Sequence, residues 1–267
     1  RFRPQVVAGF GGYAAFAPML AARLAGVPTV LHEQNAIAGM SNRILGRLAR
    51  RICLSLPGTE GFDASRTVLT GNPVRAAVVA LAGRQHDFSG KRLLVMGGSL
   101  GAHALNVHVC RHLDTLRAAG IEVRHQTGVR DEAATREAYA AAGYDPACVS
   151  AFIDDMASAY AWADLVLCRA GATTVAELCA AGLPSVLVPF PYAVHDHQTR
   201  NAQALVAEGA ALMLPEARME SDGLMAQVTD LLQDTGRLRT MAAAASGCAR
   251  VRAAELVAAE LETVCAR

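Results

Sequence analysis

The chain contains the same short helix-to-strand sequence twice. Ala25-Gly26-Val27-Pro28-Thr29-Val30-Leu31 in the first half is closely repeated by Ala181-Gly182-Leu183-Pro184-Ser185-Val186-Leu187 in the second. Each copy predicts a helix that ends at glycine, a turn at proline and a buried strand. An apolar strand, a glycine-bearing turn and a helix precede each copy, so the repeat indicates two α/β units of one kind.

A polar cluster follows each copy of the repeat. The clusters are His32-Glu33-Gln34-Asn35 and His195-Asp196-His197-Gln198. Residues just beyond the carboxyl ends of the strands line the ligand crevice of an open α/β sheet. Two such units facing one another would bring both clusters to one cleft, which predicts a ligand site between two domains.

The composition excludes several classes of protein. The 267 residues are 52% hydrophobic and 18% charged, enough for two domains with buried cores. The net charge of +1 gives no electrostatic basis for a nucleic-acid partner. The seven cysteines include no C-x-x-C pair, which is typical of a reduced cytosolic chain rather than a disulfide framework.

Two long segments carry no charge, residues 6–22 and 178–194. Both contain several glycines and prolines, which favour strand–turn–helix structure over a transmembrane span. No signal peptide is predicted. Arg1 stands close before a buried-type strand, so we expect further sequence upstream.

Alternating strands and helices predict mostly parallel sheets covered on both faces. Strands are expected at 5–9, 28–32, 51–55 and 67–70, and a second α/β run begins with a strand at 92–96. The domain boundary is expected near 76–91. Single helices are predicted over 102–119, 220–233 and about 236–265.

Gly97-Gly98-Ser99-Leu100-Gly101 joins a predicted strand to a helix and has three interpretations. As G-x-S-x-G it fits the nucleophile elbow of a serine hydrolase, with Asp154 or Asp196 and His195 or His197 as partners. As a phosphate loop it offers close backbone approach, a hydroxyl and a helix N-terminus. It also fits a tight turn without a ligand.

A second glycine turn opens the helix at 173–181. Thr173 or Thr174 is predicted to cap this helix, whose N–H groups could hold an anion. Glu177 lies one turn further along, where it could accept hydrogen bonds from a ribose diol or complete a capping box. Arg75 follows an Asn-Pro turn and is suited to a diphosphate, although a lone arginine at a strand end is more often a surface residue.

Two clusters contain metal-ligating residue types. His103, His108 and His112 lie on one predicted helix, but no glutamate intervenes as in H-E-x-x-H, so zinc is not predicted. Asp154 and Asp155 are adjacent and precede a helix, which favours an N-cap over a metal ligand.

Taken together, several segments resemble one family. They keep the family's order over nearly the whole chain and are Gly9-Phe10-Gly11-Gly12-Tyr13, His32-Glu33-Gln34-Asn35-Ala36, Gly71-Asn72-Pro73-Val74-Arg75, Gly97-Gly98-Ser99-Leu100-Gly101-Ala102, His125-Gln126-Thr127-Gly128, Phe152-Ile153-Asp154-Asp155-Met156, residues 171–177, and His197-Gln198 with Asn201-Ala202. On these motifs the chain resembles the MurG family of N-acetylglucosaminyltransferases.

The resemblance implies the GT-B fold, α/β with two Rossmann-like, doubly wound parallel-sheet domains facing a cleft. Residues 1–78 would be the C-terminal part of an acceptor-binding, membrane-facing domain that is incomplete here. Residues 85–248 would bind the donor UDP-N-acetylglucosamine (UDP-GlcNAc), and the helix at 249–267 would pack back on the first domain.

The implied activity is an inverting transfer of N-acetylglucosamine from UDP-GlcNAc to the muramyl sugar of undecaprenyl-linked lipid I, which gives lipid II for peptidoglycan. The family uses no metal and no cofactor. The implied location is the cytoplasmic face of the cell membrane, held peripherally and without a transmembrane span.

The family's site residues map onto this sequence by motif. Ile153 would read uracil through its backbone, and Glu177 would bind the ribose. Asn35 would reach the donor sugar from the other domain. The diphosphate would lie against Ser99, Arg75 and the helix start formed by Ala172, Thr173, Thr174, Val175 and Ala176. Gln198 with His197 would hold the sugar hydroxyls.

The chain departs from the family pattern in two places. Leu100 stands where the family usually has glutamine, and the family's first strand with its G-x-G-G-H loop is absent. Glu33 is the best remaining carboxylate for a catalytic base, or it orients Asn35. The histidine of the absent loop is the competing candidate for the base. The alternatives to an active transferase are a serine hydrolase that uses Ser99 and a UDP-sugar-binding fragment with impaired catalysis.

Overall fold

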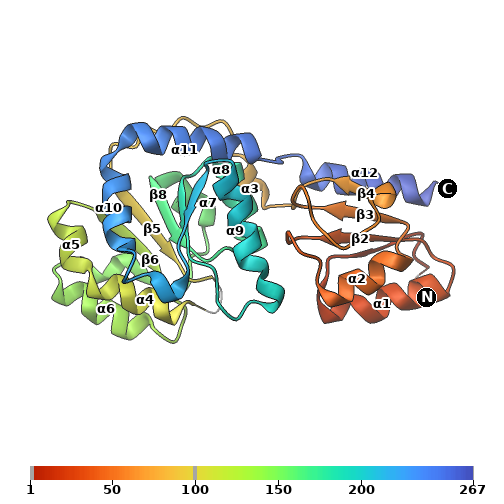
Figure 1. The fold of residues 1–267 in the computed structure, drawn as a ribbon, viewed down its shortest axis with the longest axis horizontal. Helices are drawn as coiled ribbons and strands as arrows, with labels where there is room; N and C mark the ends of the chain where they lie inside the picture. The colour runs from red at the N-terminus through yellow and green to blue at the C-terminus, as the bar shows by residue number, and fades with distance from the viewer. Residues whose placement is uncertain (1–2, 99–100, 267) are drawn as a thin grey trace.

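Two parallel sheets form the framework of the molecule. A computed structural model describes residues 3–98 and 101–266 (Figure 1). The smaller sheet has the order β1-β2-β3-β4 and the larger the order β10-β9-β8-β5-β6-β7, with every pairing parallel. Their strands are β1 (Val7–Gly9), β2 (Thr29–Glu33), β3 (Arg51–Leu54), β4 (Thr67–Leu69), β5 (Arg92–Met96), β6 (Glu122–Gln126), β7 (Val149–Ser150), β8 (Leu165–Cys168), β9 (Ser185–Leu187) and β10 (Ala211–Met213).

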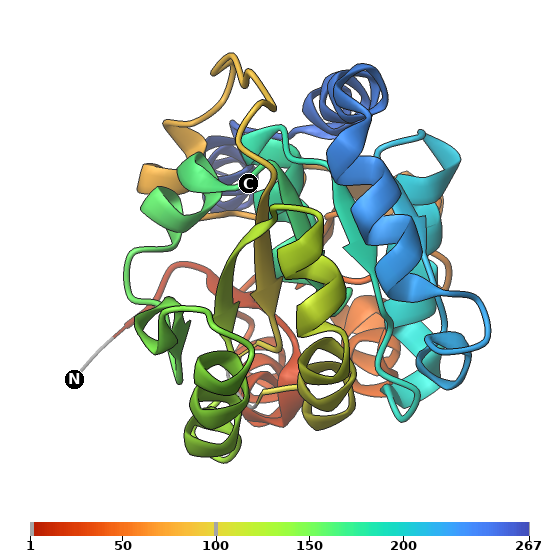
Figure 2. The same ribbon diagram turned by 90° about the vertical axis from the view of Figure 1, so that its left-hand side faces the viewer.

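Helices cover both faces of the larger sheet, as expected for a doubly wound domain (Figure 2). The α-helices are α1 (Gly12–Leu24), α2 (Met40–Leu48), α3 (Ala76–Val79), α4 (His103–Arg111), α5 (Leu113–Ala118), α6 (Glu132–Ala141), α7 (Met156–Trp162), α8 (Ala172–Ala181), α9 (His197–Ala207), α10 (Leu224–Gln233), α11 (Thr235–Cys248) and α12 (Ala253–Cys265). Short 3-10 helices are η1 (Ala64–Arg66), η2 (Pro146–Cys148), η3 (Val194–Asp196) and η4 (Glu216–Arg218). The predicted α/β fold class is confirmed.

The repeated sequence folds alike in both domains. Gly26 after α1 and Gly182 after α8 have φ values of +74° and +65°, a conformation that glycine adopts without a steric penalty. Both segments then enter a buried strand, β2 in the smaller sheet and β9 in the larger. The helix–glycine–strand prediction is therefore confirmed in both copies.

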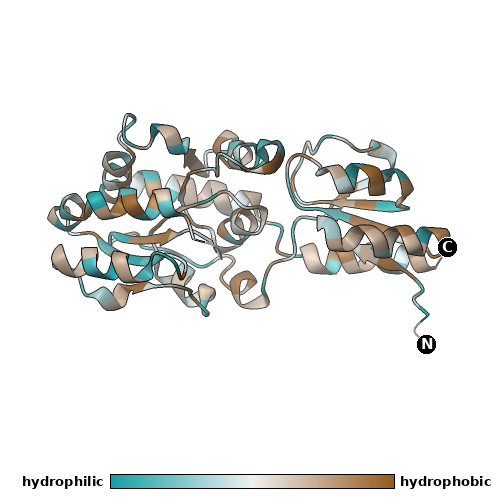
Figure 3. Cartoon of the chain, turned by 90° about the horizontal axis from the view of Figure 1, so that it is seen from below, coloured by the Kyte–Doolittle hydropathy of each residue, from teal (hydrophilic) through white to brown (hydrophobic). Residues whose placement is uncertain are grey.

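Apolar side chains from successive strand positions fill both faces of the larger sheet. Leu93 and Val95 of β5 belong to one core cluster, and Leu94 and Met96 belong to the cluster on the opposite face. Burying each such side chain is worth about 1.5–3 kcal/mol. Hydrophobic residues accordingly concentrate on the strands and on parts of the helices, with hydrophilic residues interspersed along the helices (Figure 3).

The C-terminal helix lies on the smaller domain. The chain leaves α11, crosses over at residues 249–252 and forms α12, whose Val257 and Val264 pack against Val30 and Cys53 (Figure 1). The predicted single helix over 236–265 is therefore wrong. The chain becomes extended at Ala249, because the two halves of this segment pack on different domains.

Three further sequence-based element predictions need correction. The helix predicted over 102–119 is divided at His112 into α4 and α5. The helix predicted over 220–233 begins only at Leu224, after Gly223 in a left-handed conformation. The predicted linker contains the short helix α3. Among the residues that the structure describes, none of the helices has the length and apolarity needed to cross a bilayer.

A buried carboxylate anchors the first strand of the larger sheet. Asp164 is fully buried and accepts hydrogen bonds from the Arg92 backbone N–H (2.9 Å), Nε (3.2 Å) and Nη2 (2.9 Å). Asp87 also faces the Arg92 guanidinium, at 3.6 Å, but its side chain is 70% exposed.

Asp164→Ala is expected to destabilise the protein by about 3 kcal/mol, because a buried charge pair loses one partner and a backbone N–H is left unpaired. Thermal unfolding measures the loss. Asp87→Ala is the matched control and should leave the melting temperature unchanged, since an exposed ion pair contributes little. Equal effects of the two substitutions would contradict this account.

Candidate functional site

A cavity of about 400 Å³ lies at the carboxyl ends of three strands of the larger sheet. Its walls include Gly97 and Gly98 after β5, Gln126 at the end of β6 and Arg169 after β8. This is the edge at which open α/β sheets bind ligands. The predicted residues Arg75, Ile153, Thr174, Glu177 and Gln198 all line this cavity.

The glycine turn after β5 admits no larger residue at two positions. A Cβ on Gly97 would lie 2.4 Å from the Ala102 nitrogen, and one on Gly101, at φ +77°, would lie 2.3 Å from the Thr127 carbonyl oxygen. The Gln126 side-chain amide holds the turn by donating to the Gly98 and Ala151 carbonyls at 2.9 Å each. Ser99 and Leu100 lie outside the described residues.

Arg75, Glu177 and Tyr160 form one connected group at the cavity wall. The Arg75 guanidinium donates to Glu177 Oε1 from Nη2 (2.8 Å) and Nε (3.1 Å). The Tyr160 hydroxyl donates to Glu177 Oε2 at 2.9 Å, and burial raises the pKa of Tyr160 well above its usual value. Glu177 is buried, whereas the Arg75 side chain is 54% exposed.

The start of α8 differs from its prediction. Gly171 is the N-cap and no side chain caps the helix, so the capping roles predicted for Thr173 or Thr174 and for a capping box with Glu177 are wrong. The first intrahelical bond is donated by Val175 to the Gly171 carbonyl. The amides of residues 172–174 precede it and form the positive end of the helix dipole at the cavity.

The residues of the α8 start are divided between two cavities. Thr174 lines the cavity described above, whereas Ala172, Val175 and Ala176 line a second cavity on the other side of the helix. Thr173 is exposed and lines neither.

The segment before α9 is held in an uncommon backbone conformation. His195 and Asp196 both have positive φ, 55° and 53°, which costs a non-glycine residue about 1–3 kcal/mol. This turn places Gln198 on the cavity wall, where its Oε1 accepts from the Phe190 N–H at 3.0 Å. His197 donates from Nδ1 to the Val194 carbonyl at 2.8 Å and does not line the cavity.

A buried amide joins the two domains across the cleft. Asn201 of α9 donates to Asn35 Oδ1 and to the Ala170 carbonyl, at 3.1 Å each. Its Oδ1 accepts from the Ala36 N–H at 2.9 Å. The first polar cluster therefore contacts α9 through Asn35, and its partner Asn201 lies three residues beyond the second cluster. That both clusters share one cleft stays a prediction.

Glu33 lies beneath this contact. It is 2% exposed, and its Oε1 accepts from the Asn35 backbone (2.9 Å) and side chain (3.3 Å). Its Oε2 accepts from the Gly39 N–H (3.2 Å) and from Asn42 Nδ2 (2.7 Å). A carboxylate enclosed by four N–H donors is suited to holding Asn35 in place, and this geometry favours the orienting role over that of the base.

The residues proposed as partners of a serine nucleophile do not form a triad. His197 binds the Val194 carbonyl, and Asp196 accepts from Thr199 instead of from a histidine. Asp155, rather than Asp154, caps α7, which confirms the N-cap prediction for this pair. The histidines and aspartates predicted as partners of Ser99 therefore do not form the His–Asp pairing that a serine-hydrolase triad needs.

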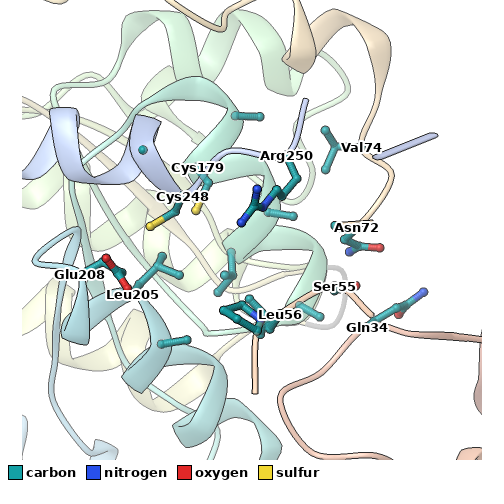
Figure 4. Close-up of a pocket in the computed structure, with 18 residues that line it drawn as sticks. Gln34, Ser55, Leu56, Asn72, Val74, Cys179, Leu205, Glu208, Cys248 and Arg250 are labelled. Atoms are coloured by element: carbon teal, nitrogen blue, oxygen red, sulfur yellow. The ribbon is translucent and has the colours of Figure 1, made fainter. Parts of the chain in front are cut away.

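The second cavity, of about 220 Å³, lies between the domains (Figure 4). Ser55 and Asn72 line it from the smaller domain, and their buried Oγ and Nδ2 atoms have no hydrogen-bond partner in the described part of the chain. Cys179 and Cys248 lie side by side in its wall (Figure 4). A hydrogen bond between the thiols raises the pKa of Cys179 and lowers that of Cys248 to about 7.

Sequence reasoning missed three residues of the site. Tyr160 carries no signal in the sequence, because a buried tyrosine on a helix is indistinguishable from a core residue until its partner is known. Arg169 pairs with Glu216 and lies over the Phe190 ring at 5.5 Å, contacts that no local pattern specifies. Asn201 belongs to the motif formed by His197-Gln198 and Asn201-Ala202, but its hydrogen-bond partners are far away in sequence.

Comparisons with known proteins point to one family. The glycosyltransferase family 28 C-terminal domain matches residues 92–257, and the family's N-terminal domain matches residues 1–54. A UDP-N-acetylglucosamine–N-acetylmuramyl-(pentapeptide) pyrophosphoryl-undecaprenol N-acetylglucosamine transferase from Nitratidesulfovibrio vulgaris is 54% identical over 96% of this chain and 72% of the relative. The protein of the same name from Lawsonia intracellularis is 49% identical, over 97% of this chain and 72% of the length of that relative. The crystal structure of MurG from Acinetobacter baumannii matches with a TM-score of 0.77 and 40% identity, over 97% of this chain and 74% of that one.

Asn201→Ala is expected to lower the stability by about 2 kcal/mol, because the Ala36 N–H, the Asn35 amide oxygen and the Ala170 carbonyl all lose a buried partner. Thermal unfolding is the measurement. Gln203→Ala, at an exposed position of the same helix, is the matched control and should have no effect. A stability loss shared by both variants would mean that helix propensity, and not the bridge, is being measured.

Proposed function

Since the chain belongs to the MurG family of glycosyltransferases, we propose that it transfers N-acetylglucosamine from UDP-GlcNAc to the muramyl sugar of lipid I and so forms lipid II. The main structural support for this proposal is the cavity beside α8. It brings a glycine turn, an arginine, a buried carboxylate and an amide side chain to the carboxyl edge of one sheet. Those groups match the diphosphate, ribose and sugar of one nucleotide sugar.

The donor occupies this cavity in the proposed complex. The backbone of Ile153 reads uracil, Glu177 binds the ribose hydroxyls, and Gln198 holds the sugar hydroxyls. Asn35 reaches the donor sugar from the smaller domain. In this proposal the Ser99 hydroxyl, Thr174 and the free backbone amides at the start of α8 bind the diphosphate.

Departure of UDP places negative charge on the diphosphate as the anomeric carbon is attacked in line by the acceptor hydroxyl. Arg75 is placed to stabilise that charge. Its exposed guanidinium exchanges one oxygen of Glu177 for the diphosphate, while Tyr160 continues to satisfy the other oxygen. The amides at the start of α8 add the helix dipole.

The acceptor side belongs to the smaller domain. Tyr13 and Leu24 on α1 and Met40 on α2 are largely exposed, at 93%, 81% and 67%. Arg23 and Arg47 lie in the last turns of the same two helices. Exposed apolar side chains and arginines on the same two helices fit peripheral contact with the anionic cytoplasmic face of the membrane, where lipid I is anchored.

The proposed division of labour follows the two sheets. Residues 1–78 contribute to acceptor and membrane contact, and residues 85–248 bind the donor. The helix within 249–267 ties the smaller domain to the donor domain through its packing on β2 and β3.

Calorimetric titration of the protein with UDP-GlcNAc in EDTA tests the donor site. We expect saturable binding of UDP-GlcNAc and none of the control GDP-mannose, because the nucleotide is read by the backbone at Ile153. A folded sample that binds neither compound would remove the donor assignment. Equal binding of both would remove the uracil reading.

Arg75→Ala is expected to lower kcat about 100-fold, or about 3 kcal/mol, as for loss of one donor to a developing charge. Affinity for UDP should fall while affinity for uridine stays unchanged. Parallel loss of uridine affinity would show that Arg75 serves only to hold Glu177. Arg84→Ala, an exposed arginine outside the cavity, is the control and should match the parent protein.

A further inference from the structure

Three metal-ligating side chains meet on the outer side of the donor domain, away from the cavity beside α8. His108 and His112 lie one helical turn apart at the end of α4, and Glu220 comes from the turn between η4 and α10. One ligand atom from each lies within 4.8 Å of the other two. Sequence reasoning discounted the histidines because no glutamate stands between them, whereas the fold supplies one from far along the chain.

The nitrogen atoms are oriented for coordination. His112 Nδ1 lies 2.9 Å from the His108 carbonyl, which can only accept, so this nitrogen carries the proton and leaves the Nε2 lone pair free. Nε2 lies 3.8 Å from Glu220 Oε1, and His108 Nδ1 lies 3.4 Å from Oε2. A backbone carbonyl that fixes the tautomer of a histidine is the usual outer-shell partner of a metal ligand.

His108 is mostly buried, at 5% exposure, and its Nε2 has no hydrogen-bond partner within the described ranges. Burial and the neighbouring His112 lower the pKa of His108. Its Nδ1, rather than the buried Nε2, faces Glu220. Glu220, in contrast, is 73% exposed on its side chain and free to adjust.

We propose that His108, His112 and Glu220 form a zinc site with one coordination position open to solvent. Two imidazoles and a carboxylate are a common ligand set for Zn²⁺ with a fourth, exchangeable ligand. Ligand atoms of a tetrahedral zinc site lie about 3.4 Å apart, given Zn–N and Zn–O lengths of about 2.1 Å. The Glu220 carboxylate oxygens lie 3.4 Å from His108 Nδ1 and 3.8 Å from His112 Nε2, so only a small movement of the exposed Glu220 side chain is required.

The open position faces a cavity of about 760 Å³ that Tyr192, Glu216 and Arg111 also line. Arg111 brings a positive charge to this cavity, which favours water, hydroxide or a small anion as the fourth ligand. Each of these completes the coordination without adding a second cation.

The metal would fasten the 216–223 segment to α4. Glu216 in the same segment pairs with Arg169, which lines the donor cavity. The site thus supports the outer wall of the donor domain from a distance. It takes no part in the proposed transfer chemistry, so its test is independent of donor binding.

The chelator-treated protein is titrated with ZnCl₂ by calorimetry and with CoCl₂ by visible absorption. We expect one equivalent of metal, a tetrahedral Co²⁺ spectrum without a sulfur-to-metal charge-transfer band, and a higher melting temperature with Zn²⁺. A spectrum with that sulfur band would assign the metal to cysteines and overturn the proposal. So would a folded wild-type protein that binds no metal at micromolar concentration.

His112→Gln and Glu220→Gln should each weaken Zn²⁺ binding at least about 100-fold, the upper range for loss of a supporting group. Both positions are at least partly exposed, so the variants should fold. The matched controls are His103→Gln on the same helix, paired with Asp131, and Asp222→Asn, paired with Arg218. Controls that lose binding as strongly as the ligand variants would show nonspecific surface binding and overturn the proposal.

Discussion

The buried amide of Asn201 is the contact on which the cleft depends. Its two donated hydrogen bonds and one accepted bond reach Asn35 and Ala36 in one domain and Ala170 in the other. A side-chain amide has both donor and acceptor groups, so it can satisfy backbone and side chain together where a carboxylate or an ammonium cannot. Because Ala170 lies in the turn before α8, the same bond relates the smaller domain to the helix that borders both cavities.

Glu177 is likewise a buried polar group whose hydrogen bonds are satisfied. A buried carboxylate is tolerated only when both oxygens are hydrogen-bonded. Tyr160 is a neutral and buried partner, while Arg75 is charged and mostly exposed. The neutral partner is thus the permanent one and the charged partner the exchangeable one. An arginine held beside a diphosphate site by a carboxylate is oriented in advance, and its charge is balanced when it does not face a phosphate.

Much of the fold could be predicted from the sequence, because local residue patterns mark where the helices and strands of parallel α/β units end and begin. Gly26 and Gly182 end their helices at positive φ, and the strands that follow are apolar. Helix divisions were not predictable in the same way. Gly247 stands just before the break at Ala249, but an isolated glycine in a helical pattern does not fix a helix end. The break arises because α11 and α12 cover different domains. The break at His112 likewise follows from packing rather than from a helix-breaking residue.

Site residues could be predicted where a single sequence motif indicates their role. They could not be predicted where the role depends on partners from distant segments of the chain. The glycine turn at Gly97 and the Glu177 carboxylate belong to the first kind. Glu33 belongs to the second, because its role depends on the four donors that surround it rather than on its sequence neighbours. The 216–223 segment is the clearest case: Glu216 turns inward to Arg169 and Glu220 outward to His108, so one short stretch after β10 touches the donor wall and the histidine pair at once. Any ligand that orders this segment on its outer side therefore acts on the position of Arg169 through a single turn of chain.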